Sequence, residues 1–154
     1  MDTLTPLQQL ISKLSQRVYT SIGPGHNESI YQKALFYELY NYNIRCDMER
    51  HIDVSYTDTI GNTHHLVSER IDIFIHKNDK LDYEEIKESN IILELKALTR
   101  TVNRTEEVQV MKYFKELEKE LTPITYGIVI NFPQASSKNN LELIELKVIN
   151  NNNN

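Results

Sequence analysis

One strongly apolar segment, residues 91–98 (IILELKAL), is interrupted only by Glu94 and Lys96. Side chains alternate between the two faces of a strand, so Glu94 and Lys96 share one face while their apolar neighbours face the opposite way. Burying a carboxylate and an ammonium group costs several kcal/mol per ion unless the two pair or bind something. The segment therefore predicts a buried core strand, and its two charges predict a metal-dependent active site.

Length and composition indicate one ordinary globular domain. The chain has 154 residues, of which 40% are hydrophobic and 25% charged, which is enough for one real core and too little for two. The formal net charge of −5 argues against a general nucleic-acid coat protein, which is usually basic. It does not exclude a nucleic-acid enzyme whose carboxylates are neutralised by bound metal. We expect one domain over residues 1–149 and a disordered asparagine tail over 150–154.

The sequence also carries signals about the cellular compartment. Cys46 is the only cysteine, so no internal disulfide can form, which fits a reducing environment. No apolar run approaches the roughly 20 residues of a membrane span, and the first residues lack a signal-peptide pattern. We therefore expect an intracellular protein that has no membrane partner.

Hydrophobic periodicity and turn residues predict the order helix, helix, three strands, helix, two strands. Thr5, Pro6 and Gln8 form a capping box at the start of the first helix, and Asn27 can cap the second. The expected elements are a helix from Thr5 to the Gly-Pro-Gly turn at 23–25, helices over 28–42 and 105–121, and strands over 44–56, 66–76, 91–98, 126–132 and 141–149. Because the third helix can serve as the crossover between parallel strands, the fold class is a mixed α/β domain.

Asp72 lies in the middle of the strand that we expect to pair with the Glu94 strand. Two carboxylates on neighbouring strands can hold a hard cation such as Mg²⁺ through oxygen, and a lysine beside them can stabilise a developing anion or activate water. These are the parts that phosphodiester hydrolysis requires. The spacing also fits a structural ion pair, Glu94 with Lys96 or Arg70 with Asp72, so it leaves both interpretations open.

Two further positions lie near this pattern. Gln109 and Tyr113 are four residues apart on the third helix, so they share a face and can hydrogen-bond a phosphate, a water or a carboxylate. They also fit an ordinary helix flank with a polar glutamine and a core tyrosine. Glu28, in the first turn of the second helix, either aims a third carboxylate at a metal or merely suits the helix dipole.

Taken together, these motifs resemble a known enzyme family. Asp72, the Glu94-Leu95-Lys96 triplet and the Gln109-x-x-x-Tyr113 element resemble the PD-(D/E)XK nuclease superfamily, the last being similar to its RecB-type exonuclease branch. The segment Gly25-x-x-Glu28-x-x-Tyr31 resembles the signature of the small GxxExxY protein family within that superfamily. Residues 93–97 (LELKA) and 130–132 (INF) are similar to that family too, and the resemblance covers about residues 5–149.

The resemblance implies specific roles. Glu28, Asp72 and Glu94 would bind Mg²⁺, for which Mn²⁺ would substitute, with the Leu95 carbonyl as a further ligand. Lys96 would be the catalytic lysine, and Gln109 and Tyr113 would line the site. The implied fold is a restriction-endonuclease-like core, a central mixed β-sheet flanked by helices in the order αα-βββ-α-ββ. One departure is Ser68, which stands where RecB-type enzymes often have a glycine four residues before the aspartate.

The implied function is hydrolysis of phosphodiester bonds in nucleic acid, with DNA as the expected substrate and a protein as a possible second partner. The alternative is a catalytically silent nuclease-fold module that binds a partner protein or nucleic acid. Small size and acidic charge favour this module, whereas the complete set of charged site residues disfavours it.

Two other charged segments bear on nucleic-acid binding. The acidic segment 77–89 would repel a phosphate backbone near the site, so we expect a solvated hairpin tip that points away from it. Arg100 and Arg104 directly follow the Glu94 strand and could meet phosphates, although neighbouring glutamates make a solvated helix face an equal alternative.

Overall fold

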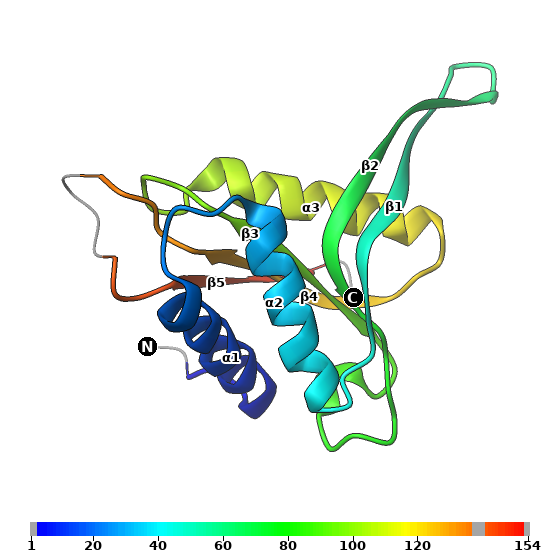
Figure 1. Cartoon of the computed structure of the whole chain (residues 1–154). Helices are drawn as coiled ribbons and strands as arrows, with labels where there is room; N and C mark the ends of the chain where they lie inside the picture. Colours follow the sequence, from blue (N-terminus) through cyan, green and yellow to red (C-terminus); the bar gives the residue numbers. More distant parts are fainter. Residues whose placement is uncertain (1–2, 137–140, 153–154) are drawn as a thin grey trace.

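The computed structural model describes residues 3–136 and 141–152 (Figure 1). The elements in chain order are α1 (Pro6–Ile22), α2 (Glu28–Asn41), β1 (Cys46–Thr57), β2 (Thr63–Ile75), a short 3₁₀ helix η1 (Glu84–Ile86), β3 (Asn90–Lys96), α3 (Arg104–Lys119), β4 (Ile124–Asn131) and β5 (Glu145–Asn150). The predicted order of long helices and strands is confirmed. The bounds differ by a few residues at most ends, since the exact ends depend on pairing and caps.

A five-stranded mixed sheet forms the centre of the fold, with strand order β1-β2-β3-β4-β5. β1, β2 and β3 form an antiparallel meander, β3 and β4 run parallel, and β5 is antiparallel to β4. The helix α3 is the crossover between the two parallel strands, as the sequence predicts. The helices α1 and α2 lie over one face of the sheet and α3 over the other (Figure 1).

Each face of β3 packs into its own hydrophobic core. Leu93 and Leu95 point into the core beneath α1 and α2. Ile92 points into the core beneath α3, together with Val110 and Phe114 of that helix. By alternation, Glu94 falls on the α3 face. The predicted assignment of faces along this strand is therefore correct, and it places a carboxylate beside an otherwise apolar layer.

The start of α1 follows the predicted capping box. The Thr5 hydroxyl accepts a hydrogen bond from the Gln8 backbone nitrogen, and the Gln8 side-chain oxygen accepts one from the Thr5 backbone nitrogen. Pro6 occupies the first helical position, where its missing N–H is not needed. At α2, Asn27 is the capping residue by position, but its side chain accepts from the Ser29 hydroxyl rather than from the helix backbone.

The acidic segment 77–89 is not simply the solvated hairpin tip that the sequence suggests. It contains η1, and Ile86 there is fully buried. The Glu85 carboxylate accepts hydrogen bonds from the Thr5 and Tyr126 hydroxyls, which tie the segment to the start of α1 and to β4. The segment leads into the first residue of β3, so it lies at the opposite end of that strand from Glu94 and Lys96 (Figure 1).

The asparagine tail begins later than expected. Asn150 is the last residue of β5, and the Asn151 side chain donates a hydrogen bond to the Ile124 carbonyl. The remaining expectation concerns residues 153–154, which lie outside the described part of the chain. Within that part, none of the helices combines the length and apolarity that crossing a membrane requires.

The approach of α3 to the sheet depends on Gly127 of β4. A Cβ atom added at this position would lie 2.5 Å from the Val110 Cγ1 atom and 3.4 Å from the Phe114 ring. Real Cβ atoms do not come so close to carbon, so any larger residue would push α3 outward. Since α3 also carries Gln109 and Tyr113, this glycine helps to set how close those side chains lie to β2.

We expect Gly127→Ala to lower the free energy of unfolding by about 1–3 kcal/mol, the usual cost of overpacking a core. Urea denaturation measures this change. In the double variant Gly127→Ala/Val110→Ala, the clashing methyl group is removed, so the combined loss should be smaller than the sum of the single losses. Simple additivity would show that the contact does not limit the distance between α3 and the sheet.

Candidate active site

Asp72 lies where β2 separates from β3. The ladder between the two strands runs from Ile75 to Ile73 and stops there, so Asp72 has no partner residue on β3. Instead, its Oδ2 atom accepts a hydrogen bond of 2.8 Å from the Leu95 backbone nitrogen. The Asp72 side chain thus takes the place of a backbone hydrogen bond between the two strands, and its carboxylate lies beside the end of β3.

Glu94 and Lys96 lie on the face of β3 predicted from the sequence. Glu94 is 3% exposed, and its Oε2 atom is 3.5 Å from the Lys96 Nζ atom. Its Oε1 atom is buried and has no hydrogen-bond partner among the described residues. The Lys96 side chain is 16% exposed, so its ammonium group reaches toward solvent. A buried carboxylate oxygen without a donor is costly unless a ligand satisfies it.

The pKa values of Asp72 and Glu94 depend on each other. Burial, and next the Asp72 charge, raise the pKa of Glu94 to about 8, while Lys96 lowers it. Burial also raises the pKa of Asp72, although the Leu95 N–H and the contact with Glu94 act in the opposite direction. Two carboxyl groups in one buried place cannot both be ionised cheaply, which favours a proton on one of them.

Glu28 reaches the same region from the start of α2. It is partly buried, and burial is the main cause that raises its pKa. Lys96 lowers this pKa, the Asp72 charge raises it, and a hydrogen bond from the Ala97 backbone lowers it. Glu28 is therefore within electrostatic reach of Lys96 and Asp72, at the end of β3.

The residues around Glu28 in the Gly-x-x-Glu-x-x-Tyr segment have structural roles. Gly25 has a φ of 101°, which favours glycine, and its nitrogen donates to the Gln134 side chain. Tyr31 is buried, stacks on Phe132 with 4.4 Å between ring centroids, and donates to the Gly23 carbonyl. These contacts fix the turn before α2 and thereby the position of Glu28.

Gln109 and Tyr113 do share a face of α3, and they bind each other. The Gln109 Nε2 atom donates to the Tyr113 hydroxyl over 3.1 Å, and that hydroxyl donates to the Arg70 carbonyl over 3.2 Å. Arg70 is two residues before Asp72. Burial, and next the Glu94 charge, raise the pKa of Tyr113, which keeps its phenol protonated. The pair therefore connects α3 to β2 beside the acidic residues.

We expect Tyr113→Phe to lower the free energy of unfolding by about 1–2 kcal/mol, because the Arg70 carbonyl and the Gln109 amide each lose a partner. Chemical denaturation checks this value. Tyr37→Phe is the matched control, since the exposed Tyr37 hydroxyl makes no hydrogen bond with the described residues and should change stability by less than about 0.5 kcal/mol. Equal effects of the two substitutions would contradict the structural role of Tyr113.

The structure also shows an anchor that the sequence interpretation missed. Arg100 forms two hydrogen bonds of 2.8 Å to the buried Glu106 carboxylate, which lowers the pKa of Glu106 to about 2. Glu106 and Asn103 form the capping box of α3, and the Asn131 side chain bonds to the backbone of Leu98 and Arg100. The Asn-x-x-Glu spacing before an amphipathic helix could have predicted this cap. Arg100 is thus paired with an internal carboxylate, while its side chain stays 45% exposed.

The structure brings some predicted site residues together and holds others apart. Asp72, Glu94 and Lys96 meet at the end of β3, with Tyr113 beside them and Glu28 at the approach. Within residues 3–136 and 141–152, no three acidic, histidine or cysteine side chains converge as a ready-made metal-binding group. The three expected carboxylates therefore do not converge: Asp72 and Glu94 form a close pair, and Glu28 lies apart from it.

Comparison with known proteins gives an independent result. A family model described as "PD-(D/E)XK nuclease superfamily" matches residues 5–144. A search of curated proteins found no match. A solved structure described as "Crystal structure of SSO0001" aligns with 95% of this chain and 78% of that chain, at 11% identity and a TM-score of 0.47. The family match extends over most of the chain and includes Glu28, Asp72, Glu94 and Lys96. The chain therefore belongs to the PD-(D/E)XK nuclease superfamily.

Proposed function

We propose that the protein is a metal-dependent nuclease that hydrolyses phosphodiester bonds of DNA. The observation that carries this proposal is the buried Glu94 carboxylate, whose Oε1 atom lacks a donor and which lies against Asp72 and Lys96. A purely structural ion pair would be expected to satisfy both of its oxygens. An acidic pair with one unsatisfied oxygen fits a site that completes itself with a cation.

The donor set fits Mg²⁺ or Mn²⁺. Asp72 and Glu94 supply carboxylate oxygens, which hard cations prefer, and no histidine or cysteine contributes that would favour zinc. Asp72 and Glu94 would hold the ion, with Glu28 and the Leu95 carbonyl as further candidates. When bound, such an ion supplies Lewis-acid stabilisation of a phosphoryl oxygen and lowers the pKa of a bound water.

The chain's own residues would divide the remaining work. Lys96, partly exposed at the end of β3, would stabilise negative charge on the reacting phosphate. Glu28 would order water at the approach to the site. Gln109 and Tyr113 would act as positioning residues, because their hydrogen bonds hold the Arg70 backbone, and with it the Asp72 carboxylate, beside Glu94.

Within the superfamily, we place the chain in the GxxExxY branch. The placement is supported by the roles of Gly25 and Tyr31, which shape the turn before α2 and present Glu28 toward Lys96. In this view the glycine and tyrosine of the motif have structural roles, and the glutamate takes part in the reaction.

The direct test is cleavage of single- and double-stranded DNA by the purified protein with Mg²⁺ or Mn²⁺. Glu94→Gln should abolish cleavage, a loss of at least about a hundredfold, because it removes a charged metal ligand. Glu118→Gln is the matched control, since Glu118 is an exposed glutamate on α3, and it should cleave like the wild type. Cleavage that persists in Glu94→Gln would refute the assigned site.

The same preparation distinguishes the alternative of a silent binding module. A competent site should gain thermal stability from millimolar divalent cation by mass action. A protein that shows neither this gain nor any cleavage, yet binds nucleic acid or a protein, would be a module that has kept the nuclease fold without its chemistry.

A further inference from the structure

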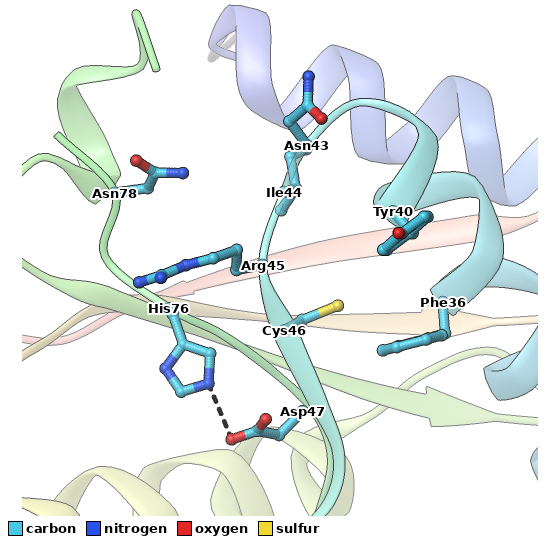
Figure 2. Close-up of a pocket in the computed structure, with 9 residues that line it drawn as sticks. All are labelled: Phe36, Tyr40, Asn43, Ile44, Arg45, Cys46, Asp47, His76 and Asn78. Carbon is cyan, nitrogen blue, oxygen red and sulfur yellow. Dashed lines mark hydrogen bonds and ion pairs between the residues drawn. The ribbon is translucent and has the colours of Figure 1, made fainter. Parts of the chain in front are cut away.

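A second concave region lies away from the acidic site, at the C-terminal end of α2. A cavity of about 730 Å³ is enclosed there by the end of α2, the start of β1 and the end of β2 (Figure 2). Its volume falls within the range of small-molecule and nucleotide sites. None of the residues that line this cavity belongs to the acidic site, so the chemistry of the cavity needs a separate explanation.

One wall of this cavity is aromatic. Phe36 and Tyr40 lie one helical turn apart on α2, and Figure 2 shows both rings on the same side of the cavity. Tyr40 is 71% exposed, and its hydroxyl makes no hydrogen bond with the described residues. Exposed aromatic faces of this kind are suited to stacking on nucleobases.

The other wall is polar and contains a free cation. In Figure 2 the Arg45 side chain points away from the two rings, and its guanidinium group lies between Asn78 and His76. Asp47 is already engaged, since its carboxylate accepts a hydrogen bond of 2.8 Å from His76. Arg45 takes part in no ion pair among residues 3–136 and 141–152, unlike Arg100 with its Glu106 partner.

A basic cavity of about 640 Å³ adjoins the aromatic one and shares Arg45 and Asn78 with it. Four cationic and two acidic side chains line this second cavity: Arg45, Lys77, Lys80, Lys87, Asp79 and Glu88. Like Arg45, Lys77 and Lys80 form no ion pair with the described residues. In a chain with a net charge of −5, this local excess of unpaired cations stands out as a place for an anion.

We propose that the two joined cavities bind one strand of nucleic acid, with a base stacked on Tyr40 and Phe36 and phosphates held by Arg45 and the lysines. Aromatic faces combined with a cationic groove are what single strands require, whereas the rigid phosphate spacing of a duplex does not need a stacking wall. This inference rests on the proposed function, because it assigns part of the substrate to a surface outside the acidic site.

The position of the cavities suits a strand that reaches both regions. One i+4 row of α2 begins at Glu28 and passes through Gln32 and Phe36 to Tyr40. The rise along the helix from Glu28 to Tyr40 is about 18 Å. His76, the first residue after β2, follows Asp72 by four residues, a distance of about 13 Å. A strand of several nucleotides bound at Tyr40 could therefore extend to the acidic site.

The test is fluorescence anisotropy of a labelled oligothymidylate of about 20 nucleotides, with EDTA present so that no cleavage occurs. Tyr40→Ala should weaken binding about tenfold, the effect of losing one stacked base. Arg45→Gln should weaken binding and reduce the slope of log K against log salt by about 0.7, the value for one phosphate contact on a single strand. The controls Tyr56→Ala and Arg17→Gln remove an exposed tyrosine and an exposed arginine elsewhere and should bind within about twofold of the wild type.

The outcomes separate this inference from the proposed function. If Tyr40→Ala and Arg45→Gln bind like the wild type, or if no variant binds the oligonucleotide at low salt, the inference is overturned and the cavities serve another ligand, such as a protein segment. If both variants lose binding while the wild type cleaves nothing, the strand-binding site stands and the nuclease assignment fails. Glu118→Gln should bind the oligonucleotide with wild-type affinity in either case, because Glu118 is exposed and lines neither cavity.

Discussion

Lys96→Ala is expected to reduce DNA cleavage by about a hundred- to a thousandfold, the usual cost of removing a charged group that stabilises a transition state. Two other cations of this region are already paired with carboxylates. Arg100 is held by Glu106, and the Lys112 ammonium is 2.6 Å from a Glu69 oxygen. Single-turnover cleavage at saturating Mg²⁺ measures the effect on the chemical step.

Lys96 also influences the acidic residues around it. Its charge lowers the pKa of Glu94, Asp72 and Glu28. Without it, protons bind the carboxylates more tightly, but a divalent cation is no longer repelled by the ammonium group, so Lys96→Ala should not need more Mg²⁺ than the wild type for half-maximal thermal stabilisation. Lys96→Arg keeps the charge and should retain the metal response while losing most cleavage, because the guanidinium is larger and planar.

The matched control is Lys115→Ala, which removes an exposed lysine from α3 and should cleave at the wild-type rate. A Lys96→Ala protein that is folded and cleaves within threefold of the wild type would contradict the assignment of Lys96. A protein that loses cleavage but keeps the wild-type metal response would assign Lys96 to the chemical step alone.

Residue spacing was sufficient to predict that Asp72, Glu94 and Lys96 lie together. Strand alternation placed Glu94 and Lys96 on one face, and the core beneath α3 confirms that face. Asp72 was expected on the neighbouring strand, and the pairing of β2 with β3 agrees. Such inferences succeed because the period of a strand is fixed by its backbone and does not depend on the rest of the fold.

Features that depend on tertiary contacts were not predictable in this way. The hydrogen bond from Leu95 to Asp72 exists because β2 pairs with β3 only from Ile73 onward, which no local pattern encodes. The burial of Ile86 within an acidic segment depends on packing against α1 and β4, so charge alone suggested a solvated tip. Likewise, the hydroxyl of Tyr113 is used by the Arg70 backbone, a partner that its sequence position did not indicate.

The protonation of Glu94 leads to the second large effect, a fall in the stability of the metal-free protein as pH rises. The pKa of Glu94 is about 8 in the folded protein and 4.5 ordinarily. Between these values the folded state binds more protons than the unfolded state, so the slope of unfolding free energy against pH is negative. The stabilising contribution is complete below pH 4.5 and is lost as pH rises through 8, a change on the order of 3–5 kcal/mol at most.

Glu94→Gln isolates this contribution, because glutamine is neutral at every pH and all other titrating groups are retained. With EDTA present, the wild type should lose stability relative to Glu94→Gln between pH 5 and pH 8, and urea denaturation at a series of pH values measures the difference. The Glu118→Gln control should follow the wild-type curve, since Glu118 is exposed. Parallel curves for wild type and Glu94→Gln would show that Glu94 is ionised in the folded protein throughout this range.

Mg²⁺ should reverse the loss, because a cation bound by Asp72 and Glu94 requires both carboxylates to be ionised. The thermal shift produced by millimolar Mg²⁺ should therefore be larger at pH 8 than at pH 5.5, where protons compete for the same oxygens. In Glu94→Gln the shift should be small at both values. A thermal shift that is independent of pH and retained in Glu94→Gln would mean that the cation binds elsewhere. The buried Glu94 oxygen would then be a structural defect of the core rather than the centre of the site.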